Sequence, residues 1–217
     1  MVFSRTVVIG CAGMGNRLGL GTTKALLDVC GKPLIIRHLE YLDDEDDIRI
    51  VVGYQAQQVI DVVNRYRRDI TFVFNHNYRN TGTGASVTLA SHYAGDFILS
   101  IDGDLLVHPD DMKKILNTRT EFVGGGEIES EDPWMLQTYD ENGKRMVSAF
   151  SKCRGNYEWN GITQMKSAKF QNGSGHVFHL IEPYLPVEYM NLRTREIDTI
   201  SDYEKANAWV SNGFEED

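Results

Sequence analysis

The chain has 217 residues, of which 41% are hydrophobic and 24% are charged, the balance of an ordinary globular protein. Its formal net charge of −9 argues against nucleic-acid or anionic-membrane partners, because both attract a basic surface. Three cysteines without a Cys-x-x-Cys pair indicate reduced thiols, and no apolar run is long enough for a signal peptide or a membrane span, so we expect a cytoplasmic protein without a membrane partner.

The first half of the chain alternates between strand-like and helix-like patterns. Apolar and β-branched runs predict strands at 6–9, 48–53, 71–74 and 97–101. Segments with helical periodicity between and after them predict helices at 33–42, 56–66, 85–93 and 110–116. Strands separated by helices in this rhythm form βαβ units and a parallel sheet.

The rhythm changes after residue 120. Three strands without intervening helices are predicted at 121–125, 135–139 and 145–150, with a hairpin turn at Glu141-Asn142-Gly143. Helices are predicted at 176–185 and 202–211, and Ser201 with Glu204 forms a capping box for the second. We therefore predict one α/β domain over residues 1–217: a Rossmann-like, mostly parallel central sheet with helices on both faces and a small antiparallel insertion.

The strongest chemical signal is a glycine-rich stretch directly after the first strand. It reads Gly13-Met14-Gly15-Asn16-Arg17-Leu18-Gly19, and Lys24 follows. Glycines let the backbone approach a polyphosphate, and Arg17 and Lys24 add two positive charges. A P-loop is excluded because Ala25 follows Lys24, and a dinucleotide fingerprint fails at Leu18. An ordinary glycine-rich connection is the alternative, and the two cations weigh against it.

The segment from Val7 to Leu42 resembles the opening of the sugar-nucleotidyltransferase-like superfamily. That family has a strand, then L-A-A-G-x-G-x-R-L, then P-K, and then G-K-P-L with a helix. The corresponding residues here are Gly10-Cys11-Ala12-Gly13-Met14-Gly15-Asn16-Arg17-Leu18, then Thr23-Lys24, then Gly31-Lys32-Pro33-Leu34. Gly10-Cys11 replaces Leu-Ala and Thr23 replaces the proline, and neither change removes a charge.

The resemblance implies a nucleotide site built from the glycine-rich stretch and from a second loop at 81–87. In the family this second loop contacts the base, whereas the alternative is a turn in which Thr83 or Ser86 caps the next helix. The nucleotide-binding residues implied are Gly10, Cys11, Ala12, Gly13, Met14, Gly15, Asn16, Arg17, Lys24, Asn77, Gly82, Thr83, Ser86 and Asp102.

Two acidic segments predict a magnesium (Mg2+) site. Asp102-Gly103-Asp104 follows the strand at 97–101, where open α/β sheets bind ligands. The resemblance assigns Asp104 as one metal ligand and Asp198, in the Glu196-Ile197-Asp198 run, as the second. Magnesium prefers such carboxylates together with phosphate oxygens. A polar strand end remains the alternative for Asp102.

The acceptor side carries the weakest signals. Lys152 and the stretch Trp159-Asn160-Gly161-Ile162 resemble the phosphocholine and phosphonate cytidylyltransferases. That likeness implies that Lys152, with Arg17 and Lys24, is catalytic. From the chemistry of the side chains we expect Trp134, Tyr157 and Trp159 to form an aromatic wall for an ammonium-bearing acceptor through cation–π contact, and Glu196 to contact the acceptor. A surface lysine and buried core aromatics are the alternatives.

These observations favour a cytidylyltransferase. We expect it to transfer CMP from CTP to phosphocholine, 2-aminoethylphosphonate or a similar acceptor and to release pyrophosphate. The alternatives are a sugar-1-phosphate nucleotidyltransferase that uses UTP, dTTP or GTP, and a nucleotide-sensing domain without activity. The sequence leaves room for a homodimer but specifies no oligomeric state.

Overall fold

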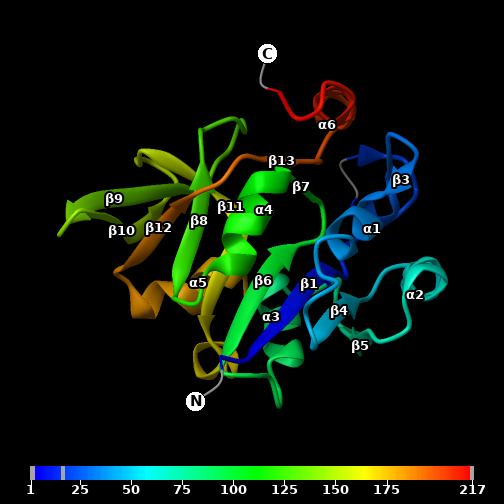
Figure 1. Ribbon diagram of the computed structural model, residues 1–217, viewed down its shortest axis with the longest axis horizontal. Helices are drawn as coiled ribbons and strands as arrows, with labels where there is room; N and C mark the ends of the chain where they lie inside the picture. The colour runs from blue at the N-terminus through cyan, green and yellow to red at the C-terminus, as the bar shows by residue number, and fades with distance from the viewer. Residues whose placement is uncertain (1–2, 16–17, 216–217) are drawn as a thin grey trace.

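The computed structural model describes residues 3–15 and 18–215, and its main feature is one large mixed sheet (Figure 1). Nine strands of this part of the chain form the sheet in the order β5-β4-β1-β6-β11-β8-β12-β10-β9. Their bounds are β1 Arg5–Cys11, β4 Ile48–Val52, β5 Thr71–Phe74, β6 Phe97–Asp102, β8 Phe122–Gly126, β9 Met135–Glu141, β10 Lys144–Ser151, β11 Tyr157–Lys166 and β12 Val187–Asn191.

The two halves of the sheet differ in strand direction. Strands β5, β4, β1 and β6 are parallel, as the βαβ rhythm predicts. Strand β11 pairs antiparallel with β6, so the antiparallel strands continue the same sheet. The sequence did not predict β11 or β12. Two short ribbons complete the strands: β2 Asp28–Val29 with β3 Lys32–Pro33, and β7 Leu105–Val107 with β13 Thr194–Glu196.

Helices cover both faces of the sheet (Figure 1). Residues of α1, α2 and α4 pack with Val7 and Ile9 of β1 on one face, and residues of α3 and α5 pack with Val8 on the other. This alternation along β1 is expected of a strand buried on both sides. The helices are α1 Leu34–Leu39, α2 Ala56–Tyr66, α3 Thr83–Ala90, α4 Pro109–Asn117, α5 Val177–Ile181 and α6 Ile200–Ser211, with 3-10 turns at Lys24–Leu26, Ser167–Phe170 and Glu182–Tyr184.

Several predicted boundaries are wrong for identifiable reasons. The helix predicted at 176–185 ends at Ile181 and becomes a 3-10 turn, because Pro183 has no N–H to continue the α-helix. The capping box of α6 is formed by Thr199 and Asp202, not by Ser201 and Glu204. The Asp202 N–H donates to Thr199 Oγ1 at 3.2 Å, and the Thr199 N–H donates to Asp202 Oδ2 at 2.9 Å.

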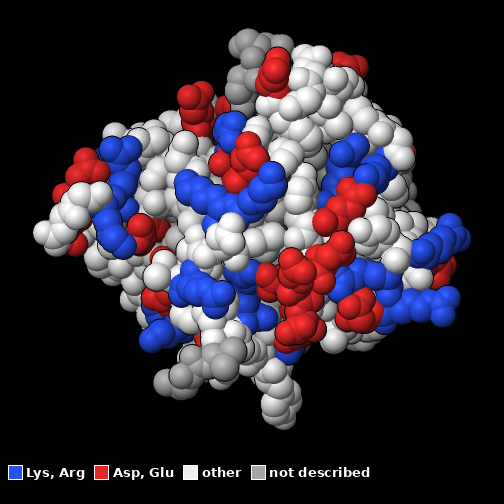
Figure 2. Space-filling view, in the orientation of Figure 1, with Lys and Arg blue, Asp and Glu red and all other residues white. Residues whose placement is uncertain are grey.

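The described surface carries both signs of charge. On the face drawn in Figure 2, lysine and arginine side chains are interspersed with aspartate and glutamate side chains. None of the helices described is long and apolar enough to cross a bilayer.

Candidate nucleotide and metal site

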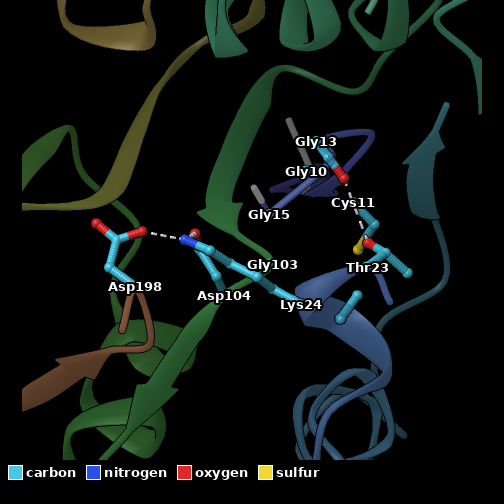
Figure 3. A pocket seen from close by; sticks show the side chains of 10 residues that line it. Gly10, Cys11, Gly13, Gly15, Thr23, Lys24, Gly103, Asp104 and Asp198 are labelled. Carbon is cyan, nitrogen blue, oxygen red and sulfur yellow. Dashed lines mark hydrogen bonds and ion pairs between the residues drawn. The ribbon is translucent and has the colours of Figure 1, made fainter. Parts of the chain in front are cut away.

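A cavity of about 390 Å³ opens where β1 and β6 end. This is the carboxyl edge of parallel strands, where α/β sheets bind ligands. Figure 3 shows side chains from the two ends of the chain converging there. The lining residues are Gly10, Cys11, Gly13, Gly15, Thr23, Lys24, Ala25, Gly103, Asp104 and Asp198.

Gly15 shapes the loop around Lys24. Its φ of +60° lies in the left-handed region, and a Cβ there would come within 3.0 Å of Lys24 Cγ. The glycine therefore lets the loop pass close to the lysine side chain. Asn16 and Arg17, predicted as nucleotide-binding with Arg17 also catalytic, lie outside the described residues.

Lys24 is the electrostatic centre of the cavity. Its ammonium nitrogen lies 2.8 Å from Asp104 Oδ2 and also pairs with Asp198 Oδ1 (Figure 3). Burial by itself would lower the pKa of Lys24, but attraction by Asp104 and hydrogen bonds to Asp104 and Asp198 outweigh it and raise the pKa above its ordinary value. Lys24 is therefore a fixed positive charge beside the two predicted metal ligands.

A third carboxylate joins these two. One oxygen each from Asp104, Glu196 and Asp198 lie within 4.8 Å of one another. Glu196 is exposed as a residue, yet burial of its carboxyl group, and then the charges of Asp104 and Asp198, raise its pKa. An all-oxygen donor set of this kind suits a hard divalent cation such as Mg2+. The expected Asp104 and Asp198 pair is thus brought together, and Glu196 lies with it.

The short β7–β13 ribbon brings Glu196 and Asp198 beside Asp104. Glu196 stands opposite Leu105 in the antiparallel register, and the Ile197 N–H donates to the Asp104 carbonyl at 3.1 Å. The Ile197 side chain is fully buried, which anchors the residue between the two acids. Backbone pairing therefore fixes residues 196–198 beside Asp104.

Asp102 lies behind this carboxylate group. Its Oδ2 would be 2.5 Å from a Cβ on Gly161, whose φ is +77°. Burial first, and then the charge of Asp104, raise the pKa of Asp102 to about 8. Asp102 is not among the residues that line the cavity, so its predicted contact with nucleotide stays a prediction.

Cys11 lines the cavity as a buried thiol. Burial, and then the charges of Asp104 and Asp102, raise its pKa above the ordinary value. A thiol held in this form is a poor nucleophile.

The second loop, predicted to hold the base, is organised by Asn75. Asn75 Nδ2 donates to Ser86 Oγ and to Thr81 Oγ1 at 3.0 Å each, and the Asn77 N–H donates to Asn75 Oδ1 at 3.0 Å. A Cβ on Gly82 would meet the Gly175 carbonyl at 2.3 Å. Sequence analysis missed Asn75, although a buried amide after a strand is a usable signal.

Thr83 and its neighbours have structural partners as well. The Val177 N–H donates to Thr83 Oγ1 at 3.3 Å, which joins this loop to α5. Asn77, Gly82, Thr83 and Ser86 do not line the cavity around Lys24, whereas Ala12 and Met14 belong to the first loop beside it. Their binding roles stay predictions.

The predicted acceptor residues divide into two groups. Trp134 and Trp159 belong to one aromatic cluster, in which Trp134 packs on Phe178 at 4.3 Å and Trp159 packs edge-on against Phe150. Tyr157 instead stacks on Tyr189, 4.4 Å between ring centroids. All three aromatics pack against the same hydrophobic cluster, so their contact with an acceptor stays a prediction.

Lys152 pairs with Asp132 and with the Trp134 ring. Its ammonium lies 5.0 Å from the Trp134 ring centroid, 2.9 Å from Asp132 Oδ2 and 2.6 Å from the Asp132 carbonyl. Lys152 is thus not among the residues lining the cavity with Lys24, and its catalytic role stays a prediction.

The fold and site together define a nucleotide-binding α/β protein with a carboxylate cluster at the sheet edge. Residues 7–153 match the family described as the MobA-like NTP transferase domain, and the chain belongs to this family. The resemblance noted in the sequence is therefore confirmed, and the domain is a nucleotidyltransferase of the MobA-like family.

Two of the curated relatives carry different names. A choline-phosphate cytidylyltransferase of Haemophilus influenzae is 33% identical over 46% of this chain and 44% of its own length. The bifunctional protein GlmU of Aliarcobacter butzleri is 29% identical over 59% of this chain and 30% of its own length. The chain spans less than half the length of these two relatives.

Solved structures share the fold over nearly the whole chain. The CTP:phosphocholine cytidylyltransferase LicC of Streptococcus pneumoniae superposes with a TM-score of 0.74, covering 95% of this chain and 99% of its own, at 20% identity. The inositol-1-phosphate CTP transferase of T. maritima superposes with a TM-score of 0.76, covering 98% of each chain, at 16% identity. These likenesses establish the fold.

Proposed function

We propose that this domain is a cytidylyltransferase that transfers CMP from CTP to a small phosphate or phosphonate acceptor and releases pyrophosphate. The observation that carries the proposal is the meeting of Lys24 with Asp104 and Asp198 at the mouth of a glycine-lined cavity. One positive and two negative groups are thereby set beside backbone that can approach a polyphosphate.

In the proposed reaction an oxygen of the acceptor attacks the α-phosphorus of the triphosphate. The new phosphorus–oxygen bond forms as the bond to the β-phosphate bridging oxygen breaks, and pyrophosphate leaves with that electron pair. A phosphate monoester is largely ionised at pH 7, because its second pKa is about 6, so no protein base is needed. Catalysis then consists of positioning and charge neutralisation.

Lys24 and the three clustered carboxylates each have a part in this scheme. Lys24 donates to the leaving pyrophosphate, and the backbone around Gly13 and Gly15 lies against the phosphates. Asp104, Asp198 and Glu196 would hold a divalent cation, which when bound supplies positive charge to the phosphate oxygens. Arg17, which lies outside the described residues, would add a second positive charge from the same loop.

A cationic acceptor is supported by the aromatic cluster around Trp134. The Lys152 ammonium rests over the face of this ring, so the ring already accepts a cation. The choline of phosphocholine and the amine of aminoethylphosphonate carry the same kind of charge. The choline-phosphate cytidylyltransferase among the relatives supports this acceptor class.

A sugar-1-phosphate acceptor with UTP, dTTP or GTP is the second candidate. The reason to test it is that a putative glucose-1-phosphate thymidylyltransferase of Bacillus anthracis shares the fold, with a TM-score of 0.75 at 19% identity. A domain that binds nucleotide without transferring it is the third reading.

A single assay separates these functions. Pyrophosphate release is measured with CTP, UTP, dTTP, GTP and ATP, each combined with phosphocholine, aminoethylphosphonate and several sugar phosphates, with and without Mg2+. The proposal expects Mg2+-dependent release that is fastest with CTP and an amine-bearing acceptor. Fastest release with a sugar phosphate would establish the second candidate, and no release from any pair would favour the non-catalytic reading.

A further inference from the structure

The Gln55 side chain forms hydrogen bonds at two points of residues 21–23, the segment between the glycine-rich stretch and Lys24. Gln55 itself belongs to a later part of the chain. It lies between β4 and α2, directly before Ala56. The Thr23 N–H donates to Gln55 Oε1 at 2.9 Å, and Gln55 Nε2 donates to the Gly21 carbonyl at 2.9 Å. Both ends of one amide therefore hold the segment that leads into Lys24.

The backbone around Gln55 is itself tied to the first strand. The Tyr54 N–H donates to the Ala12 carbonyl at 3.1 Å, and a Cβ on Gly53 would approach that carbonyl to 2.8 Å. The start of α2 is anchored by the Gln55 carbonyl, which accepts from the Gln58 N–H at 3.1 Å. Gln55 thus stands on a rigid base from which its side chain can restrain the loop.

The conformation of Gln55 indicates that its side chain is needed. Its φ of +50° and ψ of +37° are left-handed, a conformation that favours glycine and costs other residues about 1 kcal/mol or more. A glycine would fit the backbone without strain. The chain carries a glutamine instead, and both polar ends of its side chain bond to the loop.

Thr23, whose N–H bonds to Gln55, has an extended backbone. Its φ of −65° is the value that a proline ring would fix covalently, and its ψ of 140° is extended. Proline has no N–H, whereas the Thr23 N–H is satisfied by Gln55. The hydrogen bond from the Thr23 N–H to Gln55 therefore restrains Thr23 near the φ that a proline ring would fix.

We propose that Gln55 is a positioning residue for Lys24: it fixes Thr23 in the extended conformation from which Lys24 reaches Asp104 and Asp198. The contact acts through the loop and touches no substrate. Its kinetic consequences rest on the proposed nucleotidyl transfer, whereas the restraint on the loop does not.

The first test uses Gln55→Gly, which removes the side chain and relieves the left-handed backbone. We expect unchanged or higher thermal stability, faster amide exchange in the peptide covering residues 18–26, and a roughly tenfold lower kcat/KM with most of the loss in kcat. Gln57→Ala is the matched control, because the Gln57 side chain donates within α2, to Asp61 Oδ1 at 2.8 Å, and contacts neither Gly21 nor Thr23 in the hydrogen bonds of the described residues. It should leave exchange and kinetics unchanged.

The second test places Gln55→Gly in a Thr23→Pro background. Proline supplies the conformation and needs no partner for an N–H, so the loss in kcat should shrink from about tenfold to about twofold or less. Thr23→Pro alone is the reference from which the kinetic loss in this background is measured.

Two results would overturn the proposal. These are unchanged exchange at residues 18–26 in Gln55→Gly, or an equal kinetic loss from Gln55→Gly in the wild-type and Thr23→Pro backgrounds. A wild-type protein that transfers no nucleotide would instead reject the proposed function. In that case faster exchange in Gln55→Gly would still support the restraint, and unchanged exchange would reject it.

Discussion

Lys24 and Asp104 lie 80 residues apart in the chain, and their side chains meet at 2.8 Å in the cavity. The same ammonium pairs with Asp198, so one lysine joins two carboxylates that would also hold a divalent cation. In the proposed site the lysine and the cation would compete for these carboxylates until a polyphosphate drew the lysine away.

Replacement of Lys24 should consequently have opposite effects on metal binding and on turnover. Without nucleotide, Lys24→Met should bind Mn2+ about tenfold more tightly than wild type, which corresponds to about 1.4 kcal/mol, because no ammonium competes. Turnover should fall by about two orders of magnitude, the scale of one lost transition-state contact. Titration calorimetry with Mn2+ and pyrophosphate release measure the two effects.

Lys32→Met is the control for this change. Lys32 pairs with Glu40 on the surface, away from the cavity, so its loss should alter neither Mn2+ affinity nor turnover. Equal or weaker Mn2+ binding in Lys24→Met would show that the lysine and the cation do not share these oxygens. Near-normal turnover would refute the catalytic role of Lys24.

Replacement of Glu196 distinguishes a role in metal binding from a role in acceptor binding. The sequence placed it on the acceptor side, whereas the structure sets its carboxylate beside Asp104 and Asp198. Glu196→Gln should raise the Mg2+ concentration for half-maximal activity and weaken Mn2+ binding, each by roughly tenfold, because one anionic oxygen donor is lost. The KM for acceptor should stay within about twofold of wild type. A raised acceptor KM with unchanged Mn2+ affinity would restore the acceptor role.

The local half of the site was predictable because its signals are contiguous. A buried strand, a glycine-rich stretch and Lys24 follow one another in the sequence, and Asp104 follows a second strand. Parallel strands end at a common edge, which brings these segments together. The pairing of Glu196 with the Asp104 segment depends on the β7–β13 ribbon, whose three-residue strands carry too little periodicity to predict.

The second half of the sheet was harder because its strands are irregular. Strand β11 shifts register against β8 between Trp159 and Thr163, and Gly161 within it has a left-handed backbone. Such a bulge breaks the alternation on which strand prediction depends. The cap of α6 failed for a different reason: Thr199 with Asp202 and Ser201 with Glu204 have the same spacing, and propensity cannot choose between them.

Gly161 should tolerate no side chain, because a Cβ there would lie 2.5 Å from Asp102 Oδ2. Gly161→Ala should lower the free energy of unfolding by about 2 kcal/mol or more, from the left-handed backbone and the displaced carboxylate together. Gly143→Ala is the matched control: its φ of +76° is nearly the same, and a Cβ there meets nothing within 4 Å. Urea denaturation of both variants measures the difference, and equal losses would show that the contact with Asp102 costs nothing.

His38 should make the fold sensitive to acid. The residue is 3% exposed, and its Nε2 is buried without a hydrogen-bond partner in the described part of the chain. Burial lowers the pKa of His38 from 6.5 to about 4. The unfolded chain therefore binds a proton more readily, so the stability contributed by neutral His38 is complete above about pH 6.5 and is lost as the pH falls towards 4.

The size of this effect follows from the gap between the two pKa values. At about 1.4 kcal/mol per unit, the gap corresponds to about 3 kcal/mol across that range. Urea denaturation of wild type and His38→Leu at pH 7.5 and pH 5 measures it: packing changes affect both pH values equally, whereas the proton affects only the lower one. The leucine variant should therefore lose less stability between pH 7.5 and pH 5 than wild type does. An equal loss in both proteins would assign the acid sensitivity to other groups.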